Sequence, residues 1–239
     1  MKKILSLILV VAFTLSLLIF TTACSGGSKG LEFALNEDGT SYIVVGRGTC
    51  SDTELVIPKK HENLPVTAIG DNALKGWTEL ISVTIPGSVK TIGEKAFAYC
   101  KGLIEIKIEN GVETIGAEAF RGCVKLVEIV LPESTVRIER KAFAYCTDIE
   151  NFTIKSKSMT FGDLILENNK EIERISFGGT IEEWKTNVRY ENDTEEGDDG
   201  CGEDHDHGTH ENEAGDPVQW RYTTHIERVH CSDGAYYLD

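Results

Sequence analysis

The sequence predicts a β-rich α/β solenoid, in which short coils of chain stack on one another and share one apolar core. Two observations carry this prediction. Apolar residues recur every 23 residues through the middle of the chain, and seven such columns keep register over four repeats without a gap. Within each repeat, apolar residues two positions apart indicate a short strand whose alternate side chains point inward.

The composition is that of a folded chain with a strong acidic excess. The 239 residues include 24 Lys and Arg against 39 Asp and Glu, a formal net charge of −15, and 41% are hydrophobic. That hydrophobic content suffices for a core, which excludes wholesale disorder. The negative charge argues against nucleic acid as a partner, because like charges repel.

Residues 1–23 predict a lipoprotein signal peptide. Two lysines precede an uncharged, largely apolar run over residues 4–20, and Thr21-Thr22-Ala23-Cys24 then resembles a bacterial lipobox, although Thr21 stands where that pattern usually has Leu. Lipid on Cys24 would anchor the chain to the cell envelope, and residues 24–30 would form a flexible tether. Plain secretion and an uncleaved apolar anchor are the alternatives, but the run is slightly short for a spanning helix.

Residues 31–68 predict a hairpin followed by a first coil. Asp38-Gly39 lies between two stretches that are suited to strands, which indicates a hairpin. The segment Leu55 to Pro58 then resembles Val83 to Pro86 of the next repeat, with a longer connection before the regular columns begin.

Residues 69–177 hold the repeats themselves. The columns are Ile69, Ile92, Ile115 and Ile138; Ala73, Ala96, Ala119 and Ala142; Leu74, Phe97, Phe120 and Phe143; Trp77, Cys100, Cys123 and Cys146; Leu80, Leu103, Leu126 and Ile149; Val83, Ile106, Ile129 and Phe152; Ile85, Ile108, Leu131 and Ile154. The last two columns predict an inward-facing strand. The spacing of Ala96, Phe97, Cys100 and Leu103 predicts a short helical turn on the opposite wall. A degraded fifth repeat follows, with Asn169 in the cysteine column.

The cysteine column predicts free, buried thiols. Equivalent positions on stacked coils have parallel Cβ vectors, which is poor disulfide geometry, and cysteine packs well as a small buried hydrophobe. A flat row of sulfurs also lacks the tetrahedral geometry of a zinc site. Pairing of Cys201 with Cys231 in an oxidising compartment stays open.

The residue sequence of the repeat identifies the type of repeat more specifically than its length does. A period of 20–29 residues with Leu and Ile columns is typical of a leucine-rich repeat. The segment Ile92 to Cys100, followed by Leu103, Ile106 and Ile108, resembles the BspA-type leucine-rich repeat of bacterial surface proteins. The segment Leu35 to Tyr42 resembles the N-terminal cap of that family, which makes residues 31–68 the expected N-terminal cap and first coil. Residues 178–190 and 217–239 resemble its C-terminal closing unit. The resemblance implies cell-surface binding, in some members adhesion, but no common ligand.

Between the two parts of the expected C-terminal cap, residues 191–216 form an acidic insert. The segment holds 12 acids and no Lys or Arg, so we expect a disordered loop. His205, His207 and His210, with Asp204 and Asp206 beside them, are ligand types that can hold Zn²⁺ or a similar divalent cation. The other interpretation is a solvated loop without a specific ligand.

No catalytic motif stands out. There is no phosphate-binding Gly-rich loop, no Gly-x-Ser-x-Gly and no His-Glu-x-x-His. The sequence therefore predicts a non-catalytic, lipid-anchored surface protein that binds a macromolecule, expected to be protein, with no cofactor. The residues expected at the contact are the variable ones, beside the strands and elsewhere: Thr84, Lys107, Val130, Lys95, Glu118 and Arg137. The alternative is a surface lipoprotein that captures divalent metal with the histidine insert.

Overall fold

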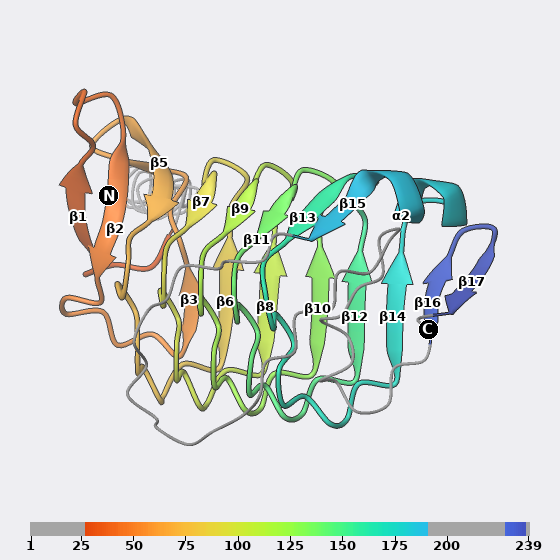
Figure 1. Ribbon diagram of the computed structural model, residues 1–239. Coiled ribbons are helices and arrows are strands. Elements are labelled where there is room, and N and C mark those ends of the chain that lie inside the picture. The colour runs from red at the N-terminus through yellow and green to blue at the C-terminus, as the bar shows by residue number, and fades with distance from the viewer. Residues whose placement is uncertain (1–26, 191–227, 238–239) are drawn as a thin grey trace, which may run out of the picture.

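The chain winds as a β-solenoid of about six turns in the computed structural model, which describes residues 27–190 and 228–237 (Figure 1). Two sheets form its walls. The nine-stranded sheet has the order β1-β2-β5-β7-β9-β11-β13-β15, with β4 paired to β5, and the eight-stranded sheet has the order β17-β16-β14-β12-β10-β8-β6-β3. The predicted solenoid is thus confirmed.

Each coil contributes one strand to each sheet. The nine-stranded sheet contains β1 (Glu32–Leu35), β2 (Tyr42–Gly46), β4 (Lys60–His61), β5 (Leu64–Ile69), β7 (Thr91–Ile92), β9 (Thr114–Ile115), β11 (Arg137–Ile138), β13 (Met159–Phe161) and β15 (Val188–Tyr190). The eight-stranded sheet contains β3 (Glu54–Val56), β6 (Ser82–Ile85), β8 (Glu105–Ile108), β10 (Glu128–Leu131), β12 (Asn151–Ile154), β14 (Arg174–Phe177), β16 (Arg228–Cys231) and β17 (Gly234–Tyr237).

The strand register follows the 23-residue period. In the parallel ladders Val83 lies opposite Ile106, and Ile129 lies opposite Phe152. The ladder continues at β16, where Val229 lies opposite Ile175. Equivalent apolar side chains therefore stack from coil to coil, which buries what no single coil could bury.

Three phenylalanines stack in the centre of the core. The ring centroids of Phe97 and Phe120 are 5.1 Å apart, those of Phe120 and Phe143 are 5.2 Å apart, and the rings are nearly parallel. All three side chains are fully buried. The predicted phenylalanine column is confirmed, and its spacing is close to the distance of about 4.8 Å between neighbouring strands.

The prediction of a short helical turn around Ala96 and Phe97 is wrong. Lys95 and Tyr99, on either side of them, have φ of 54° and 61°, and a left-handed residue ends a right-handed helix. The backbone amide of Phe97 instead donates to the carbonyl oxygen of Ala119 in the next coil, at 2.7 Å. These backbone groups bond to the next coil and are therefore not available for hydrogen bonds within a helix. Among the described residues, the one helix is α2 (Ile181–Asn187).

The N-terminal end of the solenoid carries the predicted hairpin. Strands β1 and β2 pair antiparallel, and Gly39 in their connection has a φ of 69°. The Thr40 amide donates to the side-chain oxygens of Asn36 and Asp38, at 2.9 Å each, which fixes the turn.

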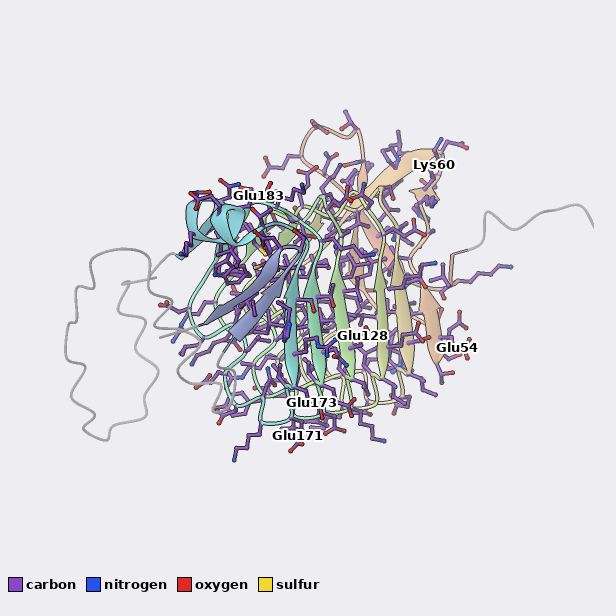
Figure 2. All side chains as sticks on the ribbon, turned by 90° about the vertical axis from the view of Figure 1, so that its right-hand side faces the viewer. Glu54, Lys60, Glu128, Glu171, Glu173 and Glu183 are labelled. Carbon is purple, nitrogen blue, oxygen red and sulfur yellow. The ribbon has the colours of Figure 1, made fainter. Side chains whose placement is uncertain are left out.

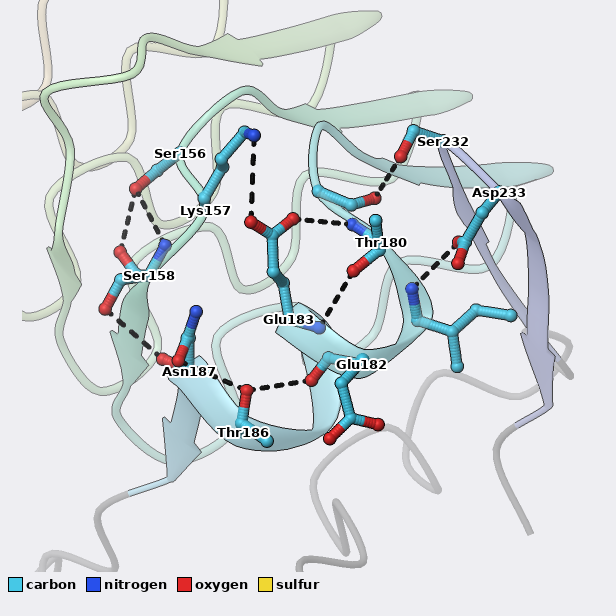
Figure 3. Close-up of polar contacts among 12 residues, drawn as sticks. Ser156, Lys157, Ser158, Thr180, Glu182, Glu183, Thr186, Asn187, Ser232 and Asp233 are labelled. Atoms are coloured by element: carbon cyan, nitrogen blue, oxygen red, sulfur yellow. Dashed lines mark hydrogen bonds and ion pairs between the residues drawn. The ribbon is translucent and has the colours of Figure 1, made fainter.

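At the other end, α2 lies across the last coil (Figure 1). Thr180 and Glu183 form a reciprocal capping box at its start, and the Glu183 carboxylate also lies 3.7 Å from Lys157 Nζ (Figure 3). Trp184 is buried against Phe177, with ring centroids 5.1 Å apart. The amide of Ile181 donates to Asp233 at 2.9 Å, which ties the β16–β17 hairpin to α2.

Several predicted features lie outside the described residues: the signal segment with Cys24, the insert at residues 191–216, and Cys201. Among the residues that are described, no helix has the length and apolar character needed to cross a membrane.

Candidate binding face

The outward positions of the eight-stranded sheet form a regular surface. Along each strand buried and outward residues alternate, as Val83 and Ile85 alternate with Ser82 and Thr84 in β6. We call this surface the outer face. Its residues are Ile81, Ile104, Val127, Glu150 and Glu173 before the strands, Glu54, Ser82, Glu105, Glu128, Asn151 and Arg174 at the strand starts, and Val56, Thr84, Lys107, Val130, Thr153 and Ser176 further along.

The structure brings together three of the six predicted contact residues. Thr84 and Lys107 are directly opposite one another in the β6–β8 ladder, and Val130 occupies the equivalent position in β10. All three lie on the outer face, where Lys107 is exposed.

The other three predicted contact residues lie elsewhere and have partners of their own. Lys95 Nζ is 2.7 Å from Glu94 and 3.8 Å from Glu118. Arg137 Nε lies 3.4 Å from the Glu139 carboxylate. These side chains hold neighbouring coils or residues together, so we do not place them in the binding face.

Sequence reasoning missed an exposed apolar column on the outer face. Ile81, Ile104 and Val127 are 45%, 45% and 37% exposed. The amide of Ile104 donates to the carbonyl of Ile81 at 2.8 Å, so the residues stack on successive coils. The sequence held a signal for this column. Its residues recur every 23 positions, and each one directly follows a residue of the leucine column instead of occupying an inward strand position.

Glutamates stack beside this apolar column without counter-ions. Glu105 and Glu128 are directly opposite each other in the β8–β10 ladder. Glu150 and Glu173 are also stacked, since the amide of Glu173 donates to the Glu150 carbonyl at 2.9 Å. Within residues 27–190 and 228–237, none of these four carboxylates has a cationic side chain within ion-pair distance. Figure 2 shows Glu54, Glu128 and Glu173 in the lower part of the molecule, toward the ends at which these strands begin.

An open hollow of about 340 Å³ lies toward the carboxyl ends of β8, β10 and β12. Its lining consists of Ile108, Asn110, Val130, Pro132, Glu133 and Lys155. Val130 joins this hollow to the outer face. The lining mixes apolar groups with one acid and one base, which suits a side chain of a larger partner better than an enclosed small ligand.

The cysteine column has the predicted free, buried thiols. Cys100 Sγ donates to the carbonyl of Leu74 at 3.2 Å, and Cys123 Sγ donates to that of Phe97 at the same distance. Burial raises the pKa of Cys100 to about 11 and that of Cys123 well above its usual value. A protonated thiol is a poor nucleophile, so the buried positions of Cys100 and Cys123 favour a packing role.

No group of three metal-ligating side chains occurs among the residues that the structure describes. His205, His207 and His210 lie outside them, as does Cys201. The metal hypothesis and the Cys201–Cys231 pairing therefore stay predictions.

Comparison with known proteins agrees with this architecture. The family described as the BspA type leucine rich repeat region matches residues 67–194, with six copies of the repeat. A leucine rich repeat protein from T. pallidum is 27% identical over 64% of this chain and 72% of its own, with a TM-score of 0.57. No curated protein matches the chain.

Two further solved structures are similar to parts of this chain. A leucine-rich repeat protein from Bacteroides capillosus is 28% identical over 52% of this chain and 92% of its own, with a TM-score of 0.47. The pneumococcal vaccine antigen PcpA is 18% identical over 67% of this chain and 42% of its own, with a TM-score of 0.50. Because the family match covers more than half of its residues, the chain belongs to the BspA type leucine rich repeat family.

Proposed function

We propose that this chain is a non-catalytic protein of the bacterial cell envelope that binds a macromolecular partner, a protein, through the outer face. The observation that carries the proposal is the regular presentation of exposed side chains on successive coils, since a solenoid offers an extended surface for recognition. The exposed apolar column adds weight, because exposed apolar side chains that lie together mark interaction sites more often than scattered ones do.

Lipid attachment to Cys24 is the second part of the proposal. The lipobox-like segment supports it, and the described body would then stand outside the cytoplasm on a short tether. A Cys24→Ser variant tests this part: in cells supplied with a labelled fatty acid, we expect the wild type to carry the label and the variant to lack it. Equal labelling of the two proteins would contradict lipid attachment to Cys24.

We also propose that the β1–β2 hairpin and α2 with the β16–β17 hairpin act as caps. The burial of Trp184 against Phe177 supports this role, since an end coil would otherwise expose its core.

The binding role is tested with the full-length protein displayed on cells. Cells that carry the wild type should retain a partner protein from their native surroundings, and cells that carry Lys107→Glu should retain a different amount of it. Lys90→Glu is the matched control, because Lys90 is an exposed lysine beside the nine-stranded sheet. No retained partner, or an equal effect of both variants, would reject the proposal.

A further inference from the structure

Charges on the solenoid are arranged differently on its two sides. Away from the outer face, opposite charges on successive coils pair: Lys90 Nζ lies 2.8 Å from Glu113, and Lys141 Nζ lies 3.6 Å from Glu167. Both pairs join residues roughly one coil apart, which is how a stacked repeat stabilises itself with opposite charges.

On the outer face, residues of like charge lie next to each other on successive coils. Glu105 lies opposite Glu128, and Glu150 stacks with Glu173, so each glutamate has another glutamate at the neighbouring position one coil away. Like charges directly opposite in a ladder destabilise it. The cations of the outer face, Lys107 and Arg174, form no ion pair with these carboxylates. An incoming positive charge would relieve this repulsion.

The apolar column lies directly beside these carboxylates. Ile104 immediately precedes Glu105, and Val127 immediately precedes Glu128, with both residues of each pair exposed. A ligand that covers this part of the face must therefore present apolar groups and positive charges side by side. A metal ion offers positive charge without apolar groups, and a small anion offers neither, whereas a polypeptide with interspersed basic and apolar side chains offers both.

We propose that the outer face binds a basic polypeptide segment whose apolar side chains cover Ile81, Ile104 and Val127 and whose Lys or Arg side chains pair with Glu105, Glu128 and Glu150. This inference rests on the proposed function and names the chemistry of its partner. Opposite charge would also speed association, and the effect would weaken as salt screens exposed charges.

The test measures binding of a short peptide of alternating lysine and leucine to the purified full-length protein, by isothermal titration calorimetry. The double variants E105Q/E128Q and I104T/V127T alter the face at exposed positions. E37Q/E182Q and V45T/V136T are matched controls, since these residues are also exposed but lie outside the outer face. Circular dichroism checks that every variant keeps the strand content of the wild type.

We expect each face variant to weaken binding about three- to tenfold, in line with the small worth of each exposed pair, and the controls to change it less than twofold. Binding should also fall as salt increases. Equal binding by all five proteins, or equal affinity for a peptide of alternating glutamate and leucine, would overturn the inference. So would self-association of the protein that I104T/V127T abolishes in sedimentation, because a second copy would then be the occupant.

The outcomes separate this inference from the proposed function. A partner whose retention on cells changes with Lys107→Glu, but is unchanged by all four face substitutions, would leave the proposed function standing and overturn the basic-peptide inference. Absence of any retained partner would instead reject the proposed function, while the peptide titration would still decide the chemistry of the face.

Discussion

The side-chain amide of Asn169 donates to the carbonyl oxygen of Phe143 at 2.8 Å. One coil earlier, Cys146 Sγ donates to the carbonyl of Phe120 at 3.1 Å. Asn169 occupies the cysteine column of the degraded repeat and is equally buried there. From Cys100 to Asn169 the column therefore places a small buried donor on a carbonyl of the preceding coil, and the thiol is one way to supply it. Trp77, at the start of the column, makes no such hydrogen bond.

Asn169→Ala should destabilise the protein, because it leaves the buried Phe143 carbonyl without its donor. We expect a loss of about 1–3 kcal/mol in the free energy of unfolding. Asn169→Cys, which restores the residue type of the other coils, should lose less. Urea denaturation measures both, and equal losses for the two variants would contradict the donor role.

The buried thiol of Cys100 predicts a loss of stability at alkaline pH. Burial raises its pKa in the folded state to about 11 from an ordinary value of 9.0, so above pH 9 the unfolded chain loses a proton that the folded chain keeps. Stability contributed by this group is complete below pH 9 and falls between pH 9 and about 11, by up to about 1.4 kcal/mol per pH unit. Cys100→Ser, which does not titrate there, should show a shallower decline in denaturation at several pH values. An identical slope would refute this source of the pH dependence.

Removal of the central aromatic ring should be costly. Phe120 stacks between Phe97 and Phe143, and Phe120→Ala should lower the free energy of unfolding by about 3–5 kcal/mol. Val136→Ala, at an exposed position, should change it by no more than about 0.5 kcal/mol. A loss at Phe120 as small as that at Val136 would show that the column does not carry the core.

Opposite effects are expected from the same substitution on the two sides of the solenoid. Glu128→Lys places a positive charge opposite Glu105, and it should raise the free energy of unfolding by about 0.2–1 kcal/mol. Glu113→Lys places a positive charge beside Lys90, and it should lower stability by a similar amount. Melting temperatures at low salt provide the measurement, and shifts of the same sign would contradict unrelieved repulsion on the outer face.

The periodicity of the sequence was enough to predict the coil stacking, because side chains at equivalent positions of stacked coils meet. Phe97 and Phe120, 23 residues apart, are neighbours for this reason. The same pattern predicts the turns incorrectly. The spacing of Ala96, Cys100 and Leu103 also fits a helix, and the left-handed backbone at Lys95 and Tyr99 has no signature in apolar periodicity.

The binding face could be predicted only in part. Thr84, Lys107 and Val130 were identified because strand alternation places them outward. The ion-pair partners of Lys95 and Arg137 could not be predicted, since an ion pair depends on how close two side chains come in the folded chain. The exposed column with Ile104 was missed because an apolar residue at a fixed period is ordinarily assigned to the core.

The most direct test of the outer face as the binding surface is site-specific photo-cross-linking on full-length protein. A photoreactive amino acid replaces either Lys107 on the outer face or Lys90 beside the nine-stranded sheet, both of which are exposed. The lysine–leucine peptide is added and the mixture is irradiated. We predict a cross-linked product from position 107 and none above background from position 90; equal cross-linking from both positions, or from position 90 alone, would contradict the account.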